Sequence, residues 1–207
     1  MKYDNTTNII VLGERYAGKS LFIYNYLYNS RKVDNLAPTI GVDYYKKILH
    51  YEGNTYLFKI WDTGNGLLYK SILDFYFKNS SIFIIIVKDN DTTFIKDIFD
   101  IIHTDDKINP SNVFILYNKK INEDNFKFNE VELLKYNTKV ENVHFVYINI
   151  HNNNEVHYVF DKIKSYIFSE YMNSINSNIN RQKTLIPLNT NINKIDKKET
   201  CCYCTIS

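Results

Sequence analysis

The chain has 207 residues, of which 44% are hydrophobic, enough for one sizeable buried core with some sequence left over. The formal net charge is only +2 and basic residues are scattered among acidic ones, which argues against a nucleic-acid-binding protein. No apolar run approaches the roughly 18 residues of a membrane span, and residues 1–4 lack the apolar core of a signal segment. We therefore expect a cytosolic domain.

The first predicted element is a buried strand at residues 9–12, which leads through a glycine-bracketed loop into a helix. The loop has the spacing of a phosphate-binding loop and consists of Gly13, Glu14, Arg15, Tyr16, Ala17, Gly18, Lys19 and Ser20. A strand-to-helix turn directs backbone N–H groups and the positive end of the helix dipole at one point, where nucleotide phosphates can bind. In this arrangement Lys19 reaches the β- and γ-phosphates and the Ser20 hydroxyl ligates Mg²⁺.

A polar segment at residues 29–39 follows, and its length is typical of a functional loop. Two strand-like runs at residues 44–51 and 55–61 flank the turn Glu52-Gly53-Asn54, which predicts an antiparallel hairpin. Asp62 comes directly after the second run and precedes a glycine-containing loop. An acidic residue at the carboxyl end of a strand lies where α/β sheets bind ligands.

The rest of the chain alternates strands and helices. Predicted strands lie at residues 82–87, 113–117 and 143–148, and predicted helices at residues 92–103, 129–136 and 154–171. The run 82–87 is apolar throughout, which is typical of a parallel strand buried on both faces. The alternation predicts a doubly wound α/β domain over residues 5–171. The Asn- and Ser-rich residues 172–207 have no apolar periodicity, and we expect a flexible tail there.

The three cysteines, Cys201, Cys202 and Cys204, all lie within the last seven residues and cannot cross-link the domain. Residues 204–207 match a C-a-a-X ending whose final serine favours farnesylation of Cys204. A single prenyl chain gives only marginal, reversible membrane binding. We therefore expect Cys201 or Cys202 to carry a second prenyl or palmitoyl group.

Several segments in the same order resemble the small GTPases of the Ras superfamily, and specifically the Rab group. The resemblance covers about residues 5–170 and the cysteine-containing tail. Beyond the phosphate-binding loop, residues 39–44 resemble the switch I segment and residues 59–63 the strand that leads to switch II. The resemblance implies a P-loop small-GTPase fold: a six-stranded, mostly parallel sheet with one antiparallel edge strand and helices on both faces.

The resemblance also implies GTP or GDP bound together with Mg²⁺. Ser20, Thr39 and Asp62 would form the metal site, with Thr39 sensing the γ-phosphate and Asp62 holding the metal through water. Asn118 and Lys119 would contact the guanine base. The full set of implied nucleotide contacts is residues 13–20 with Leu21, Thr39, Asp62, Asn65, Asn118, Lys119 and Ile150.

Switch II departs from the family pattern Asp-Thr-Ala-Gly-Gln-Glu, because residues 62–67 are Asp-Thr-Gly-Asn-Gly-Leu. Gly66 stands in place of the glutamine that orients the attacking water, so no catalytic side chain is expected there and hydrolysis should be slow. Asn65 replaces a glycine whose N–H meets the γ-phosphate, and asparagine accepts the left-handed conformation better than most residues. Arg15 and Tyr16 stand at usually small positions, where their bulk could crowd an activator.

The base-recognition motif also departs from the family. Ile121 replaces the aspartate that accepts two hydrogen bonds from guanine. Hydrogen bonds to a charged group contribute about 1.5–3 kcal/mol each, so losing two weakens guanine preference by roughly 10²–10⁴-fold. The Ser-Ala-Lys base loop of the family corresponds here to Asn149-Ile150-His151.

The intact phosphate and metal residues favour a Rab-like GTPase, a monomeric GTP/GDP switch in vesicle traffic that binds effector, exchange-factor and escort proteins. It would lie on the cytoplasmic face of an intracellular membrane, with a cytosolic pool. Residues 186–188 resemble the apolar motif that docks on the Rab escort machinery, so geranylgeranylation competes with farnesylation. Gly66 and Ile121 favour the alternative, a pseudo-GTPase that binds nucleotide without efficient hydrolysis or not at all.

Overall fold

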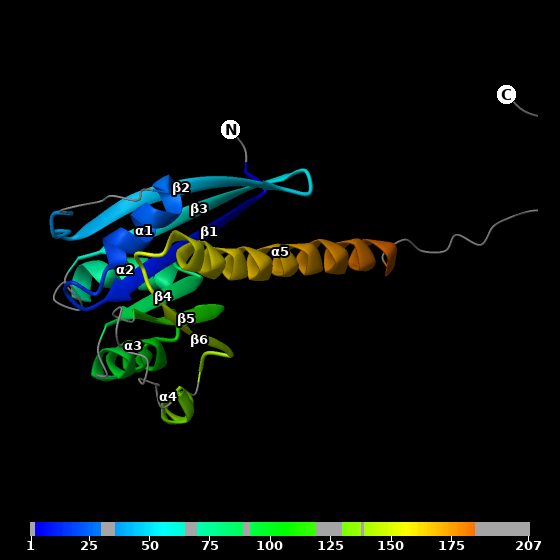
Figure 1. Cartoon of the computed structure of the whole chain (residues 1–207). Coiled ribbons are helices and arrows are strands. Elements are labelled where there is room, and N and C mark those ends of the chain that lie inside the picture. The colour runs from blue at the N-terminus through cyan, green and yellow to red at the C-terminus, as the bar shows by residue number, and fades with distance from the viewer. Residues whose placement is uncertain are drawn as a thin grey trace, which may run out of the picture. The chain divides into compact units, whose positions relative to one another are not determined.

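The computed structural model describes residues 3–29, 36–64, 70–88, 92–118, 130–137 and 139–184 (Figure 1). The strands are β1 (Asn5–Gly13), β2 (Val42–Tyr51), β3 (Asn54–Thr63), β4 (Ile82–Val87), β5 (Asn112–Asn118) and β6 (Asn142–Ile148). The helices are α1 (Lys19–Tyr28), α2 (Lys70–Asn79), α3 (Thr93–Thr104), α4 (Glu130–Tyr136) and α5 (Asn153–Thr184).

The six strands form one sheet in the order β2-β3-β1-β4-β5-β6. Only the β2–β3 pair is antiparallel; the other four pairs are parallel. The predicted fold class, a mostly parallel sheet with one antiparallel edge strand, is therefore confirmed. The register places Val11 of β1 opposite Asp62 of β3. The phosphate-binding loop and Asp62 therefore lie at the same end of these two parallel strands.

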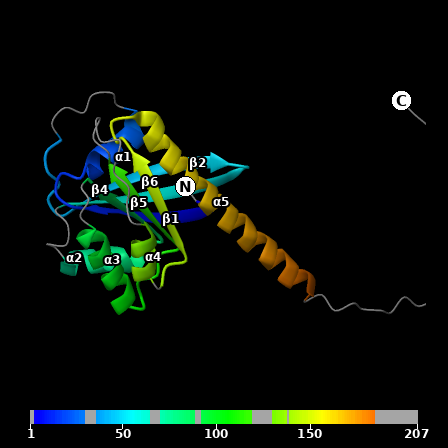
Figure 2. The same cartoon turned by 60° about the horizontal axis from the view of Figure 1, so that its bottom comes forward.

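The buried stretches of the central strands are residues 9–12 of β1, all of β4 and residues 113–117 of β5. They are apolar, as expected where helices cover both faces of a sheet. Every residue of β4 is buried, as the continuous apolar run at residues 82–87 predicts. On one face, Phe22 of α1 stacks on Phe160 of α5, with ring centroids 5.1 Å apart. On the other, Leu73 of α2, Phe99 of α3 and Leu133 of α4 join one buried cluster. Figure 2 shows this division of the helices between the two faces.

The β2–β3 hairpin turns at Glu52 and Gly53, whose φ angles are 48° and 77°. Two successive positive φ values are the mark of a two-residue turn whose twist matches the flanking strands. Both strands are longer than predicted, since β2 begins at Val42 and β3 ends at Thr63. Asp62 therefore lies inside the end of β3 and not beyond it, where the ladder with β1 holds its backbone.

Helix α5 continues to Thr184, past the end at residue 171 that the loss of apolar periodicity predicted. Extending an existing helix adds one hydrogen bond per residue fixed, so it needs no apolar stripe. Ser169 and Ser174 also donate to the carbonyl groups of Tyr166 and Tyr171. The compact unit that contains the sheet ends at Ser169. No helix within the described residues is long and apolar enough to cross a membrane.

Candidate nucleotide-binding site

The phosphate-binding loop joins β1 to α1, as predicted. Gly18 precedes the first residue of α1 with φ at 98°, a conformation that favours glycine. Its carbonyl accepts the first intrahelical hydrogen bond, from Phe22 N at 2.9 Å. A Cβ at residue 18 would also collide with Cδ1 of Ile150. The positive φ is therefore the main reason for glycine at this position, and any larger residue would also require the Ile150 side chain to shift.

Lys19 lies folded over the loop, with 7% of its surface exposed. Its Nζ donates to the carbonyl oxygens of Gly13 at 2.9 Å and Glu14 at 2.8 Å. Burial lowers the pKa of Lys19 to about 8, and the nearby charges of Asp62 and Glu14 oppose this shift. The side chain thus remains mainly an ammonium cation at neutral pH, placed at the mouth of a loop suited to phosphate.

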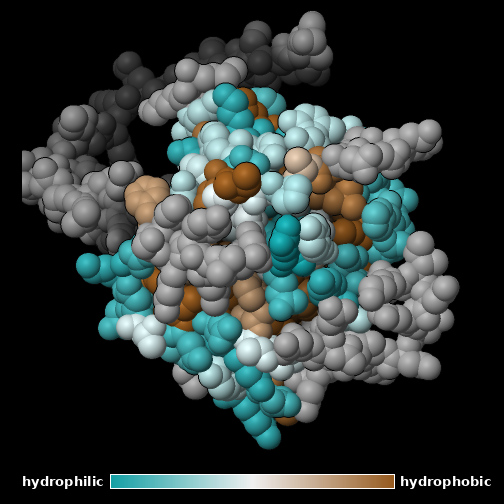
Figure 3. All heavy atoms as spheres, turned by 90° about the vertical axis from the view of Figure 1, so that its left-hand side faces the viewer, coloured by the Kyte–Doolittle hydropathy of each residue, from teal (hydrophilic) through white to brown (hydrophobic). Residues whose placement is uncertain are grey.

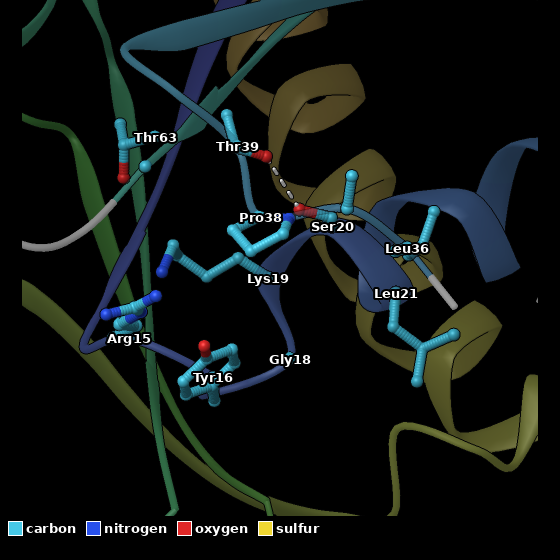
Figure 4. A pocket seen from close by; sticks show the side chains of 12 residues that line it. Arg15, Tyr16, Gly18, Lys19, Ser20, Leu21, Leu36, Pro38, Thr39 and Thr63 are labelled. Carbon is cyan, nitrogen blue, oxygen red and sulfur yellow. Dashed lines mark hydrogen bonds between the residues drawn. The ribbon is translucent and has the colours of Figure 1, made fainter. Parts of the chain in front are cut away.

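Three oxygen-bearing side chains from three parts of the chain meet beside Lys19. Ser20 Oγ on α1 lies 3.1 Å from Thr39 Oγ1, which precedes β2. Thr39 Oγ1 donates to Asp62 Oδ2 at 3.3 Å. Figure 4 shows the Ser20 and Thr39 hydroxyl groups pointing toward each other across the cavity. The structure therefore brings together all three residues of the predicted metal site.

Asp62 is fully buried, and its second carboxylate oxygen, Oδ1, has no hydrogen-bond partner within the described part of the chain. Burial raises the pKa of Asp62 to about 6, against the opposing effects of the Ser20 hydroxyl and the Lys19 ammonium. An unpartnered buried carboxylate oxygen is costly unless another group meets it. Mg²⁺ prefers oxygen ligands and keeps several waters, so one carboxylate and two hydroxyl groups fit this ion.

The cavity around these residues has a volume of about 250 Å³. It lies at the carboxyl ends of β1 and β3, and Figure 3 views the molecule from the side on which these strands end. Its lining, drawn in Figure 4, is Arg15, Tyr16, Gly18, Lys19, Ser20, Leu21, Leu36, Ala37, Pro38, Thr39, Thr63 and Gly64. Leu36, Ala37 and Pro38 were not predicted individually. Their only signal in the sequence is the length of the loop that contains them.

Gly64 provides a close contact between the two segments that flank the metal site. Its N–H donates to the carbonyl of Gly41 at 2.7 Å. A Cβ on Gly64 would lie 2.6 Å from the carbonyl oxygen of Thr39, which is shorter than any normal contact. The absence of a side chain at residue 64 therefore permits the backbone of Thr39 to lie against the end of β3.

The other end of the site is built around Asn118, the last residue of β5. Its Nδ2 donates to the carbonyl of Ala17 at 3.3 Å, and its Oδ1 accepts from the N–H of Ile150 at 3.3 Å. The carbonyl of Ile150 accepts from Asn25 Nδ2 on α1. Asn118 thus ties the phosphate-binding loop to the segment between β6 and α5, with the side chain of Ile150 buried between them.

A family model described as the Ras family matches residues 8–169, which include the cavity lining and the sheet apart from the first three residues of β1. The chain belongs to the Ras family. It is 26% identical over 211 residues to a "Probable Rab-related GTPase" of Acanthamoeba polyphaga mimivirus, covering 97% of this chain and 94% of that protein. It is also 33% identical over 78 residues to "Ras-related protein RABC2b" of Arabidopsis thaliana, covering 38% of this chain and 37% of that protein.

These relatives identify a Rab-like small GTPase of the Ras superfamily, so the predicted family is confirmed. Ras-family proteins in general bind GTP or GDP with Mg²⁺ and hydrolyse GTP. The structure gathers the predicted phosphate and metal residues beside the cavity, whereas Asn118 and Ile150 contact the phosphate-binding loop without lining the cavity. Five of the predicted site residues lie outside the described residues: Asn65, Lys119, Cys201, Cys202 and Cys204. Gly66 and Ile121, the two main departures from the family, also lie there.

Proposed function

We propose that this Rab-like GTPase is a GTP/GDP-dependent switch in intracellular vesicle traffic, anchored by lipid to the cytoplasmic face of a membrane. The observation that carries the proposal is the meeting of Ser20, Thr39 and Asp62 beside the buried ammonium of Lys19. These groups come from α1, from the segment before β2 and from β3. Three such side chains from separate parts of the chain rarely meet without a shared function. Family membership and the Rab-related relatives support the same reading.

The nucleotide phosphates would lie on the N–H groups of the loop that begins α1, where the helix dipole is positive. Lys19 would move its hydrogen bonds from the loop carbonyls to phosphate oxygens. Bound Mg²⁺ supplies positive charge that neutralises the phosphates, and Ser20, Thr39 and Asp62 would hold it. Thr39 lies in the segment before β2. Loss of the γ-phosphate on hydrolysis would therefore change the conformation of a surface segment that effectors and exchange factors can bind.

The direct test of nucleotide binding is mass spectrometry of the small molecules that the purified protein releases on denaturation. The proposal expects GDP or GTP in amounts near one per protein chain, together with Mg²⁺. Lys19→Ala should release none. If the wild-type protein releases no nucleotide and takes none up from a GTP-containing solution, it is a pseudo-GTPase and the proposal is wrong.

Hydrolysis is proposed to be slow, on the order of 10⁻⁴ s⁻¹ or less as in unassisted Ras-type enzymes, because Gly66 cannot orient water. Gly66→Gln adds one side chain able to hold the water. A hydrogen bond worth about 1–1.5 kcal/mol corresponds to a roughly tenfold faster single-turnover rate. A rate that does not change in Gly66→Gln shows that residue 66 is not the water-orienting position.

Membrane anchoring is proposed through Cys204, with Cys201 or Cys202 as a second lipid site. Cys204→Ser should leave the protein entirely in solution when cell membranes are floated on a density gradient. The double change Cys201→Ser with Cys202→Ser should give weak, reversible binding, because one prenyl chain remains. A Cys204→Ser protein that still floats with membranes contradicts this assignment.

A further inference from the structure

Two large side chains lie on the phosphate-binding loop at positions that the family usually keeps small. Arg15 and Tyr16 both line the cavity and are drawn below Lys19 in the view of Figure 4. The guanidinium carbon of Arg15 lies 4.8 Å from the centre of the Tyr16 ring, within the range of a cation–π contact. The two residues therefore form a pair, which we name the Arg15–Tyr16 pair.

Tyr16 adopts an unfavourable backbone conformation without any gain from burial. Its φ is 63°, and for a residue with a bulky side chain the left-handed region costs roughly 1–2 kcal/mol. The side chain is 70% exposed, so packing in the core does not offset that cost. Backbone strain of this kind persists mainly at ligand-binding and switching sites. The left-handed conformation of Tyr16 thus belongs to the path of the phosphate-binding loop and not to a packed core.

The location of Lys19 shows which part of a nucleotide the pair would meet. In phosphate-binding loops the lysine reaches the β- and γ-phosphates. Here Lys19 Nζ donates to the carbonyl of Glu14, the residue directly before Arg15. Lys88, at the end of the neighbouring strand β4, donates through Nζ to the carbonyl of Arg15 at 3.4 Å. Arg15 is therefore held from its backbone and from its side chain, beside the place where the proposed function would put the terminal phosphates.

We propose that Arg15 is an additional phosphate-binding residue, positioned by Tyr16, that favours the nucleoside triphosphate over the diphosphate. This inference rests on the proposed nucleotide-binding function. A guanidinium presents a planar set of N–H donors that suits phosphate oxygens, and the γ-phosphate adds both charge and acceptors. From the size of the two side chains alone, the sequence predicted only that they crowd an approaching activator. In this proposal the pair also binds the nucleotide.

The test compares equilibrium affinities for GDP and for GppNHp, a GTP analogue that resists hydrolysis, in the full chain with Mg²⁺. Arg15→Ala should weaken GppNHp binding by roughly tenfold to a hundredfold, the loss of one hydrogen-bonded charge, and leave GDP binding nearly unchanged. The matched control is Lys96→Ala. It removes a cation on α3 that pairs with Glu132 at 2.8 Å outside the cavity, so both affinities should stay at the wild-type values.

Substitutions of Tyr16 separate positioning from simple obstruction. Tyr16→Phe keeps the ring and should keep the wild-type preference for GppNHp. Tyr16→Gly removes the ring and also relieves the left-handed strain, yet it should lower that preference as Arg15→Ala does. If Arg15→Ala and Tyr16→Gly leave the preference unchanged or increase it, the pair only obstructs the cavity and the inference is wrong.

The same measurements distinguish failure of this inference from failure of the proposed function. Lys19→Ala should lose GDP and GppNHp together, because its ammonium belongs to the general phosphate site. A wild-type protein that binds neither nucleotide overturns both proposals. A wild-type protein that binds both, with an unchanged preference in Arg15→Ala, overturns only the role of Arg15.

Discussion

The two ends of the candidate site, the phosphate end around Lys19 and the base end around Asn118, preserve the family pattern to different degrees. At the phosphate end the chemical groups themselves are retained: an ammonium on Lys19, two hydroxyl groups and the buried carboxylate of Asp62. At the base end the retained feature is a structural link, in which Asn118 joins Ala17 to Ile150. The groups that would read the base differ, since Ile121 cannot accept a hydrogen bond through its side chain.

In the proposed site, different groups therefore hold the loop in place and select the base. The link through Asn118 uses one side-chain amide and two backbone groups, so it tolerates changes in the neighbouring side chains. Base selection depends on particular acceptors, which this chain lacks at residue 121. A protein built in this way can bind the triphosphate part of a nucleotide firmly while discriminating weakly among bases.

Removing the phosphate end should have the largest effect. Lys19→Ala deletes the charged donor that is proposed to bind two phosphates. A loss of about 1.5–3 kcal/mol for each hydrogen bond corresponds to a roughly 10²–10⁴-fold weaker affinity. Ser20→Asn, which removes the metal-binding hydroxyl, should also weaken binding strongly in the presence of Mg²⁺. Isothermal titration with GDP measures both effects. Nucleotide affinity that survives Lys19→Ala would show that the phosphates bind elsewhere.

Restoring the missing hydrogen-bond acceptor at residue 121 should increase the selectivity for guanine over adenine nucleotides. Ile121→Asp supplies two carboxylate oxygens for the N1–H and amino group of guanine, so GTP binding should tighten by up to roughly 10²–10⁴-fold. ATP has no matching pair of donors and should gain nothing. Competition of labelled GTP by unlabelled ATP in the two proteins gives the change in selectivity. Equal selectivity in both would show that other groups read the base.

Cutting the link between the ends should have an intermediate effect. Asn118→Ala leaves the carbonyl of Ala17 and the N–H of Ile150 without their partner, which costs about 1–3 kcal/mol of unfolding free energy. Denaturation in urea, with the protein free of nucleotide, measures this loss. Stability equal to that of the wild type would mean that water replaces the amide group and that the link contributes little.

The sheet and the loop between β1 and α1 could be predicted from the sequence because both depend on local patterns. A buried strand followed by Gly18 and Lys19 at fixed spacing specifies a loop whatever lies around it. The closing wall at Leu36, Ala37 and Pro38 could not be predicted, since their place depends on how a polar loop folds over a distant helix. The extension of α5 to Thr184 also went unpredicted, because continuing a helix leaves no periodic signal.

The smallest predicted effect lies outside the cavity, at His144 on β6. Its Nε2 lies 3.0 Å from Asn112 Oδ1, and its ring stacks on Phe114 with centroids 4.5 Å apart. Burial, with a smaller contribution from Lys162, lowers the pKa of His144 below its ordinary 6.5. The unfolded chain therefore binds this proton more readily, and stability should fall as the pH drops below about 6.5.

His144→Gln keeps a polar side chain beside Asn112 but removes the titrating ring. Its unfolding free energy should consequently vary less between pH 7.5 and pH 5.5 than that of the wild-type protein. Urea denaturation at the two pH values provides the comparison. Parallel losses in the two proteins would assign the acid sensitivity to other groups. Nucleotide selectivity should stay the same, because neither end of the candidate site contains this residue.

The contact at Gly64 has a consequence for any attempt to engineer faster hydrolysis. Grafting the complete family segment would introduce alanine at residue 64 along with glutamine at residue 66, and that alanine would collide with the backbone of Thr39. The benefit of the glutamine would then be hidden by a displaced threonine. The effect of glutamine at residue 66 thus depends on the residue at position 64, so the two substitutions are epistatic. Glutamine should be introduced at residue 66 first. Alanine at residue 64 would be tolerated only after the segment before β2 had shifted.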